Sequence, residues 1–405
     1  MRKIDTRSFV RATRSTARKI NSQIALNLVR EHGPISRADL ARRLRVGRGM
    51  VTALVDELLE VGVIVEGASV DAPRGRRPRM LFVRTRDRLA VAIDVRFSQT
   101  SLMLTDFAGT PIAMQIFETI ADPRALVAEL KARISRLLKQ HRAAGKCDGI
   151  GLVVPGMVDQ QTGRVLNAPQ LAWRDVDVRT ALAKATGFPV HIENAPIACA
   201  LAQMWLGQRG LESPRDFVYV TVSDGVGAGV VVNGEVVRGH GNSAGEFGHV
   251  PLELNGPRCL CGARGCLEAY TSNLATLCRY LGNEFSPESA RTLMIESGLT
   301  IADVITRALS GEERATRALE ETARYLGIGL AVIINALNPD QIFVGGEITA
   351  VWDRISPVIR REIETRALTA RAAGTPVSPE LGTYPRLRGA TALVAAPMFA
   401  APRVA

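Results

Sequence analysis

The chain has 405 residues, of which 46% are hydrophobic, and its formal net charge is +11 at pH 7. This length is enough for two or three domains with a sizeable core, and no apolar run approaches the roughly 18 residues of a membrane-spanning helix. Residues 1–88 hold 20 Lys and Arg against 9 Asp and Glu, so the entire positive excess lies in the first fifth of the chain. That distribution excludes a uniformly basic protein and predicts one polyanion-binding module on a neutral body.

The N-terminal sequence and the cysteines bear on the cellular compartment. The first residues are basic but no apolar segment follows them, so secretion is not expected and the cytoplasm is the expected location. Cys259, Cys261 and Cys266 fall within eight residues, and without a secretion signal so tight a cluster favours metal binding over a disulfide framework. The other three cysteines are expected to be ordinary core or surface residues: Cys147, Cys199 and Cys278.

The basic module begins with a segment of low apolar content. Residues 1–19 contain five Arg and two Lys, and we expect them to form a mobile basic arm. Three short helices are predicted next, within residues 20–88. The first ends at Gly33-Pro34, and the second begins at Ser36 with Asp39 in the spacing of a capping box. The apolar positions of the three helices are Ile20, Ile24, Leu28, Leu40, Leu44, Val51, Leu54, Val55 and Leu58.

Two short apolar runs, at residues 63–65 and 80–83, follow the third helix and predict a two-stranded ribbon. Three helices and a ribbon in this order are typical of a winged helix-turn-helix, whose third helix presents short or polar side chains to base edges. The Arg-rich loop of the ribbon suits a narrow minor groove. The residues predicted to contact DNA are Arg45, Arg48, Gly49, Thr52, Arg74, Arg76 and Arg77. The alternative is a three-helix dimerisation or protein-binding module with solvated charges.

The remaining residues, 89–405, alternate between strands and helices. Strands are predicted at residues 89–95, 101–105, 112–117, 150–154, 217–222, 229–232 and 341–344, and long helices at 123–141 and 312–337. The order strand, Asp-containing turn, strand, Gly turn, strand occurs twice, the second time with the hairpin signal Asn233-Gly234. A duplicated α/β body of this kind leaves a cleft between its halves, which is a natural site for a small molecule.

Several motifs of this body lie close to predicted strand ends. They are the Pro155-Gly156 turn, Glu193-Asn194-Ala195, Gly245-Glu246-Phe-Gly-His249, and Cys259-x-Cys261-Gly-x-x-Gly-Cys266-x-Glu268. In this combination, from about residue 17 onward, the chain resembles the ROK family (repressors, open reading frames, kinases), in particular its transcriptional regulators. The resemblance implies an α/β fold in which a winged helix-turn-helix precedes a two-lobed, actin-like (hexokinase-like ATPase) domain over residues 89–405.

A metal site is also indicated by residue types and spacing alone. His249, Cys259, Cys261 and Cys266 offer one imidazole and three thiolates within 18 residues. Zn²⁺ favours a tetrahedral set of three cysteines and one histidine when the site is structural and closed to water. Two glycines between the last two cysteines allow the backbone to turn sharply. Zinc is therefore the predicted cofactor, and the alternative is three buried free thiols beside a core histidine.

The predicted sugar site depends on the resemblance. In the family's kinases, the glutamate and histidine of Glu-x-Gly-His and a later glutamate contact sugar hydroxyls, and the strand-end asparagine and the Pro-Gly turn lie beside them. The corresponding residues here are Gly156, Asn194, Glu246, His249 and Glu268. Carboxylates and amides can each pair with two hydroxyls, as vicinal diols require, and zinc would hold the loop that carries them. The alternative places the two glutamates on solvated loops.

Two parts needed for phosphoryl transfer are missing. The family's kinases carry Glu-Asn-Asp with the aspartate as base, whereas residues 193–195 read Glu-Asn-Ala, and a methyl group cannot accept a proton. Loss of a general base typically costs about 10²–10⁴ in rate. Kinases also carry Asp-x-Gly-Gly-Thr, whereas residues 94–98 read Asp-Val-Arg-Phe-Ser and place side chains where the backbone must approach phosphate. We therefore expect no enzymatic activity.

The combined prediction is a sugar-responsive, DNA-binding transcriptional regulator that acts as a repressor. Its expected partners are a double-stranded DNA operator and a sugar or sugar-phosphate effector, and a homodimer or homotetramer would match a roughly palindromic operator. Effector binding between the lobes would change their closure and the spacing of the DNA-binding heads. Two alternatives stay open: a sugar kinase fused to a DNA-binding domain, and a regulator controlled by a partner protein instead of a sugar.

Overall fold

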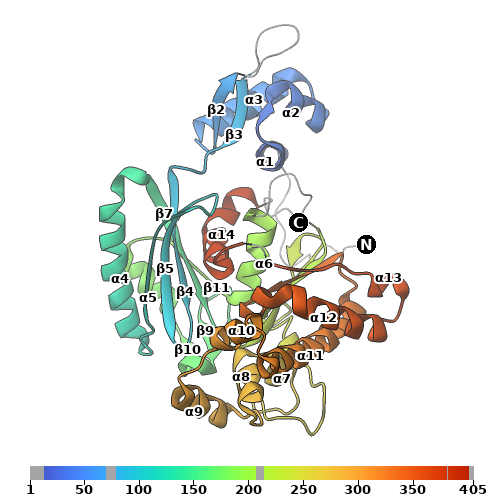
Figure 1. Cartoon of the computed structure of the whole chain (residues 1–405). Coiled ribbons are helices and arrows are strands. Elements are labelled where there is room, and N and C mark those ends of the chain that lie inside the picture. The colour runs from blue at the N-terminus through green and yellow to red at the C-terminus, as the bar shows by residue number, and fades with distance from the viewer. Residues whose placement is uncertain (1–12, 70–78, 207–213, 381, 401–405) are drawn as a thin grey trace.

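The structure is a computed structural model of the chain, and it describes residues 13–69, 79–206, 214–380 and 382–400. A small helical head lies at one end of a larger α/β body (Figure 1). Within the described residues, no helix is both long enough and apolar enough to span a bilayer.

The head consists of three helices and a small antiparallel sheet with the strand order β1-β3-β2. Its elements are α1 (Arg14–His32), β1 (Ile35–Ser36), α2 (Arg37–Leu44), α3 (Arg48–Glu60), β2 (Ile64–Ser69) and β3 (Arg79–Val83). Ser36 caps α2 as predicted, because its Oγ accepts a hydrogen bond from the Asp39 backbone N–H (3.1 Å) and donates to the Asp39 carboxylate (2.6 Å). Helices and ribbon therefore follow one another in the order of a winged helix-turn-helix.

Two expectations for α1 are wrong. The helix begins at Arg14 with Thr13 as its N-cap, so the last part of the predicted arm (residues 1–19), from residue 14 to residue 19, is helical, while residues 1–12 lie outside the described residues. The buried face carries Ala25, Leu26 and Val29, whereas Ile24 is 45% exposed. The reason is that α1 packs in one core with both the head and the last helix, α14 (Pro385–Phe399). A stripe of bulky side chains cannot reveal a second packing partner that lies almost 400 residues away.

The body contains two five-stranded sheets of identical topology. Their strand orders are β11-β7-β4-β5-β6 and β14-β13-β12-β15-β16. In each sheet three consecutive strands form an antiparallel meander and two later strands run parallel to the first. The strands are β4 (Arg88–Val95), β5 (Gln99–Asp106), β6 (Pro111–Glu118), β7 (Lys146–Val154), β11 (Val190–Asn194), β12 (Phe217–Val222), β13 (Val226–Val232), β14 (Glu235–Val236), β15 (Gln341–Gly345) and β16 (Val377–Pro379). The predicted duplication, and with it the two-lobed α/β fold, is confirmed.

Smaller elements complete the two lobes. A third sheet in the first lobe consists of β8 (Met157–Val158), β9 (Val165–Ala168) and β10 (Trp173–Val176). The helices are α4 (Pro123–Gln140), α5 (Val178–Thr186), α6 (Ala195–Leu206), α7 (Leu267–Thr271), α8 (Asn273–Leu281), α9 (Pro287–Ser297), α10 (Ile301–Leu309), α11 (Glu313–Leu337), α12 (Trp352–Arg366), α13 (Ala370–Ala373) and α14, with short 3₁₀ turns at Arg142–Ala144, Pro169–Leu171, Phe247–His249 and Glu347–Val351.

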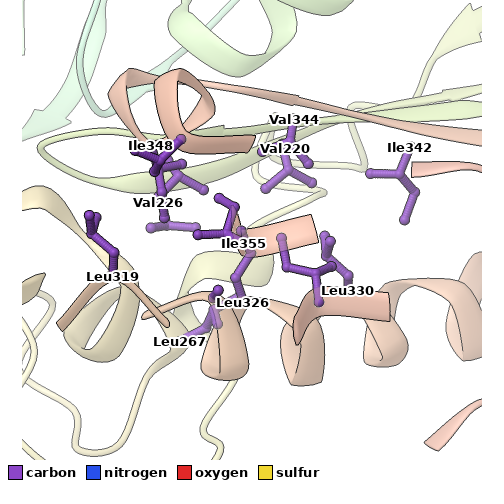
Figure 2. Close-up of a cluster of buried hydrophobic side chains, with 14 of the residues drawn as sticks. Val220, Val226, Leu267, Leu319, Leu326, Leu330, Ile342, Val344, Ile348 and Ile355 are labelled. Atoms are coloured by element: carbon purple, nitrogen blue, oxygen red, sulfur yellow. The ribbon is translucent and has the colours of Figure 1, made fainter. Parts of the chain in front are cut away.

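Each lobe has its own hydrophobic core. In the first lobe, α4 and α5 cover one face of the sheet and α6 and α14 cover the other. In the second lobe, Val220 and Val344 of the sheet pack against Leu326 and Leu330 of α11 and Ile355 of α12 (Figure 2). This division matters for the site, because α6 and α14 are the helices that lie between the lobes and the head.

Candidate functional site

The four predicted metal ligands lie together. The imidazole of His249 and the thiols of Cys259, Cys261 and Cys266 place their ligand atoms within 4.8 Å of one another. The Cys261 and Cys266 sulfurs are 3.7 Å apart, and Cys259 Sγ lies 3.7 Å from His249 Nδ1. A tetrahedral zinc with Zn–S bonds of about 2.3 Å has edges of about 3.8 Å between its sulfurs. The cluster is therefore able to hold a metal ion of tetrahedral preference.

Glycines in the loop between the cysteines permit this arrangement. Gly262 and Gly265 both have positive φ, 93° and 69°. A Cβ on Gly265 would lie 1.7 Å from the carbonyl oxygen of Glu253, so no other residue fits there. Cys259 closes the loop by donating its N–H to the Ala263 carbonyl (2.8 Å) and by accepting at its own carbonyl from the Gly262 N–H (3.0 Å). The turn that brings the sulfurs together is thus specified by glycine and by backbone pairing.

The predicted sugar-binding residues of the second lobe surround this cluster. Glu246 and His249 flank a 3₁₀ turn, and the Glu246 carboxylate lies 3.8 Å from His249 Nε2. The two imidazole nitrogens therefore face different groups, Nδ1 the thiols and Nε2 the carboxylate, so one histidine can serve both predicted roles. The pKa of Glu246 is raised overall, mainly by burial. The charge of His249 lowers this pKa and that of Glu268 raises it.

Glu268 lies on α7, two residues after the last cysteine of the cluster. Its side chain is buried, at 8% exposure, which excludes the alternative of a solvated loop for this residue. Its Oε2 accepts a hydrogen bond from the Val226 backbone N–H (2.9 Å), and Cys259 Sγ lies 3.5 Å from Oε1. The carboxylate is thereby held between the thiol cluster and the hairpin that joins β12 to β13.

Gly156 and Asn194 belong to the first lobe. Gly156 lies two residues after β7 and Asn194 is the last residue of the neighbouring parallel strand β11, where it pairs with Val154 at the carboxyl edge of the sheet. Gly156 has a φ of 82°, and a Cβ there would lie 2.0 Å from the Asn167 carbonyl oxygen. Asn194 caps α6 by accepting a hydrogen bond from the Ile197 N–H (3.1 Å). Both residues are thus placed at the edge of the first lobe, with clear structural roles of their own.

One contact between the lobes was not anticipated from the sequence. Arg238, in the loop that leads into Glu246, places Nη1 2.6 Å from the buried carboxylate of Glu193, and Gln160 donates to the same oxygen (2.7 Å). Burial raises the pKa of Glu193 and the Arg238 charge lowers it. The sequence showed a Glu-Asn pair at a strand end. The partner of Glu193, Arg238, lies 45 residues further along the chain, and spacing alone does not identify it.

A second contact between the lobes is centred on Arg96, which follows β4. Its Nη2 donates to the Glu347 carboxylate (2.7 Å) and to the Ser223 hydroxyl, and it lies 3.5 Å from Asp224. Asn273 donates to both Asp224 and Glu347. Burial lowers the pKa of Arg96, but Glu347 and Asp224 reverse the effect, so its pKa is raised overall. We refer to Arg96, Ser223, Asp224, Asn273 and Glu347 as the inter-lobe ion-pair network.

A cavity of about 360 Å³ adjoins this network. Residues from both lobes and from the start of α14 line it, including Asp94, Arg96, Glu347 and Arg386. Asp94 is buried and lies 2.8 Å from Arg386 Nη2. Burial raises the pKa of Asp94, and the charges of Arg386 and Arg96 oppose this shift. The four charged residues named here therefore form two ion pairs, Asp94 with Arg386 and Arg96 with Glu347.

Comparison with known proteins identifies the family. The ROK family model matches residues 90–396. The chain belongs to the ROK family.

A putative xylose repressor from Caldicellulosiruptor sp. (strain Rt8B.4) is 31% identical over 369 residues, which cover 86% of this chain and 88% of that protein. A ROK family transcriptional regulator, a homologue of the E. coli MLC protein, has a TM-score of 0.77 at 26% identity and covers 95% of this chain and 97% of that one. A ROK family glucokinase from Streptomyces griseus, in complex with glucose and AMPPNP, has a TM-score of 0.63 at 25% identity, covering 98% of that chain but 75% of this one.

The position that follows Asn194 departs from the ROK kinase motif. Ala195 is the first residue of α6 and is 6% exposed, and its methyl side chain cannot accept a proton. Glu193 is directed away into its pair with Arg238. The loop at residues 94–98 departs as well, because the guanidinium of Arg96 extends from it into the second lobe.

The head places four of the predicted DNA-contacting residues on one surface. Arg48, Gly49 and Thr52 are exposed on the first turns of α3, and Thr52 Oγ1 donates to the Arg48 carbonyl (3.0 Å). Arg45, exposed and in the left-handed conformation, ends α2 immediately before them. The other three residues lie outside the described residues: Arg74, Arg76 and Arg77.

Proposed function

We propose that this ROK family protein is a sugar-responsive transcriptional repressor. Its head binds a double-stranded DNA operator through the first turns of α3 and through the Arg-rich wing, and its body binds a sugar or sugar phosphate between the lobes. Arg48 and Thr52 are exposed at the end of α3 that enters the major groove in winged helices. The basic excess of residues 1–88 adds the phosphate contacts on which affinity depends.

The observation that carries this proposal is a site that keeps sugar-binding groups without a base. Glu246, His249 and Glu268 lie around one thiol cluster, whereas the residue after Asn194 is the buried Ala195. Hydroxyl groups of a sugar can be held by such carboxylates and by the amide of Asn194. Without a proton acceptor beside the attacking hydroxyl, holding the sugar is the function that remains.

The metal in the thiol cluster is zinc in this proposal. His249, Cys259, Cys261 and Cys266 supply a tetrahedral set that suits zinc, and the ion would fix the loop between Glu246 and Glu268. Cys259 and Glu268 are already in contact, so the position of the carboxylate depends on the position of the thiol. Zinc would thus have a structural role, and the sugar contacts would come from the protein.

A second feature, besides the alanine at position 195, supports the proposal that this protein does not transfer phosphoryl groups. In the inter-lobe ion-pair network, the Arg96 side chain contacts the hairpin between β12 and β13, where the family's kinases place a glycine-rich phosphate loop. A guanidinium that is paired with Asp224 and Glu347 occupies volume and uses hydrogen-bonding capacity that a nucleotide would need.

The proposal assigns residues 14–83 to the DNA-binding head and the residues from Arg88 onward to the sugar-binding body. The join is the turn after β3, in which Arg84 pairs with Asp87. A dimer or tetramer would place two heads on a roughly palindromic operator, because the symmetry of a site follows the symmetry of the protein. Light scattering of the purified chain with and without operator DNA measures this assembly.

Operator selection followed by a sugar panel tests the function. Genomic fragments retained by the full-length protein are sequenced, and fluorescence anisotropy then gives the operator affinity with D-xylose, D-glucose, N-acetyl-D-glucosamine and their phosphates. We expect one sugar to change the affinity by about 5–150-fold, the usual range of allosteric coupling. Failure to bind any duplex at moderate salt overturns the proposal. Binding without any sugar response would instead support control by a partner protein, and sugar-dependent ATP turnover would show a kinase.

Arg48→Ala probes the recognition surface. If Arg48 contacts a base, operator affinity falls by about 1–3 kcal/mol and discrimination at one base pair is relaxed. Arg317→Ala is the matched control, because this arginine is exposed on α11 of the body and is 69% accessible. Equal operator affinities for the two variants would remove α3 from the proposed interface.

A further inference from the structure

Two helices run from the cleft between the lobes to the head. Helix α6 begins directly after Asn194, whose side chain caps it, and Arg386, the second residue of α14, pairs with Asp94 beside the inter-lobe cavity. The other ends of both helices point toward α1 (Figure 1). Any change of lobe closure therefore acts on the first turn of each helix.

The two helices cross at van der Waals contact. A Cβ on Gly389 of α14 would lie 2.6 Å from the carbonyl carbon of Ala198 in α6, so glycine is needed at the crossing. Leu387 and Ala390 pack with Ala195 in the same core cluster. Interiors packed this closely transmit small shifts instead of absorbing them.

Helix α1 of the head is attached to the last turn of both helices by side-chain hydrogen bonds. Arg30 Nη1 donates to the carbonyls of Met204 (3.2 Å) and Trp205 (3.3 Å) at the end of α6. At the end of α14, Gln23 donates to the Met398 carbonyl (2.8 Å) and Asn27 to the Phe399 carbonyl (2.8 Å). These acceptors are carbonyls of the last turn of a helix, which lack partners within the helix.

Arg30 also joins the two helix ends to each other. Its guanidinium lies over the rings of Trp205 (4.9 Å) and Phe399 (5.4 Å), and these two rings stack with their centroids 6.1 Å apart. Burial lowers the pKa of Arg30, and Glu31 raises it. A planar, charged group that both stacks and donates is a role that lysine cannot reproduce.

We propose that α1 senses the state of the inter-lobe cleft through the C-terminal ends of α6 and α14, and that Arg30 is the positioning residue of this coupling. The inference rests on the proposed function, since it describes how that function is regulated. A rigid helix of 12 residues is about 18 Å long, so a tilt of about 5° at the cleft displaces its far end by about 1.6 Å. A displacement of that size breaks or re-forms hydrogen bonds of 3.2–3.3 Å and turns α1 relative to the body.

The first test separates coupling from binding. Operator affinity of full-length protein is measured with and without the sugar that gives a response in the panel named above. We expect Arg30→Met to keep the sugar affinity within about twofold of the native value. The ratio of operator affinities without and with the sugar should fall to less than about twofold, whereas a merely structural role of Arg30 would leave that ratio unchanged. Arg133→Met is the matched control, because Arg133 also stacks on an aromatic ring, Phe117 (4.1 Å), but lies on α4.

A second test needs no sugar. Arg96→Ala breaks the inter-lobe ion-pair network, and hydrogen exchange reports on the amides of α1. We expect Arg96→Ala to raise the rate of amide hydrogen exchange in α1 at least threefold in the otherwise native protein. In the Arg30→Met protein, the same substitution should leave that rate unchanged. Equal responses in both backgrounds would overturn the coupling role. If no panel sugar binds, the proposed effector fails while this test still decides the inference. If Arg30→Met is poorly folded, Asn27→Ala is used in its place, because it removes one hydrogen bond between α1 and α14.

Discussion

Two regions of the body that meet at the β12–β13 hairpin differ in what they contain. On one side, Glu246, His249 and Glu268 surround a thiol cluster and form part of the proposed sugar site. On the other side, Arg96 satisfies Asp224 and Glu347 within the protein itself. The same hairpin serves both, since its Val226 N–H binds Glu268 and its Asp224 faces Arg96. The proposed sugar site and the inter-lobe ion-pair network are therefore adjacent and share one hairpin.

The largest expected effect concerns the thiol cluster. Cys261 is exposed, so Cys261→Ser removes a ligand at little packing cost. We expect the bound metal to be lost and sugar affinity to fall at least tenfold, because the loop between Glu246 and Glu268 loses its anchor. Elemental analysis and calorimetry measure the two effects. Cys147→Ser, on β7, is the control, and an unchanged metal content in Cys261→Ser would show that the cluster is not a metal site.

Restoring the missing parts of a kinase is the next way to test the comparison. Ala195→Asp supplies a carboxylate at the end of β11, and we expect no turnover from it alone because Arg96 still fills the other side. Combined with Arg96→Gly, it should raise sugar-dependent ATP hydrolysis above background, since a base contributes about 10²–10⁴ in rate. A coupled assay with D-glucose measures this. Turnover by the Ala195→Asp variant alone would show that Arg96 does not block the site.

Removing Arg96 alone has a smaller expected effect on stability. Arg96→Ala leaves Glu347 and Asp224 partly buried without their main cation, and we expect a loss of about 1–3 kcal/mol in the free energy of unfolding. Urea denaturation followed by far-UV circular dichroism measures it. Arg317→Ala, whose ion pair with Glu313 is exposed, should cost less than about 0.5 kcal/mol. Similar losses for both variants would contradict an inter-lobe role for Arg96.

The smallest expected effect is a pH dependence from His191 on β11. Burial lowers the pKa of His191 from 6.5, and the positive charge of Arg179 lowers it further. The unfolded chain then binds this proton more readily, so stability falls as the pH decreases below 6.5 toward the folded-state pKa. His191→Gln should reduce the loss of unfolding free energy between pH 7 and pH 5 by less than about 1 kcal/mol. Urea denaturation between pH 5 and 7 checks this, and an identical slope in the variant would refute it.

The parts of the site that consist of residues close together along the chain could be predicted from the sequence. The four residues predicted to bind a metal lie within 18 residues, and the structure places them together. The exposed turn of α3 likewise follows from a local pattern. The contacts of Arg96 with Glu347 and of Arg238 with Glu193 were not predicted, because each joins residues of different lobes. A polar residue at a strand end shows that it needs a partner but not which one.

The sequence by itself determined the duplicated strand order, the capped start of α2, the grouping of His249 with three cysteines and the alanine at position 195, because each depends on residues that are close along the chain. Only the tertiary structure decided which face of α1 is buried, how Arg96 is paired, and that Arg30 contacts the ends of α6 and α14. These features depend on segments brought together by the packing of whole helices and sheets. Hydrophobic and charged side chains can satisfy many such partners, and the folded geometry selects one.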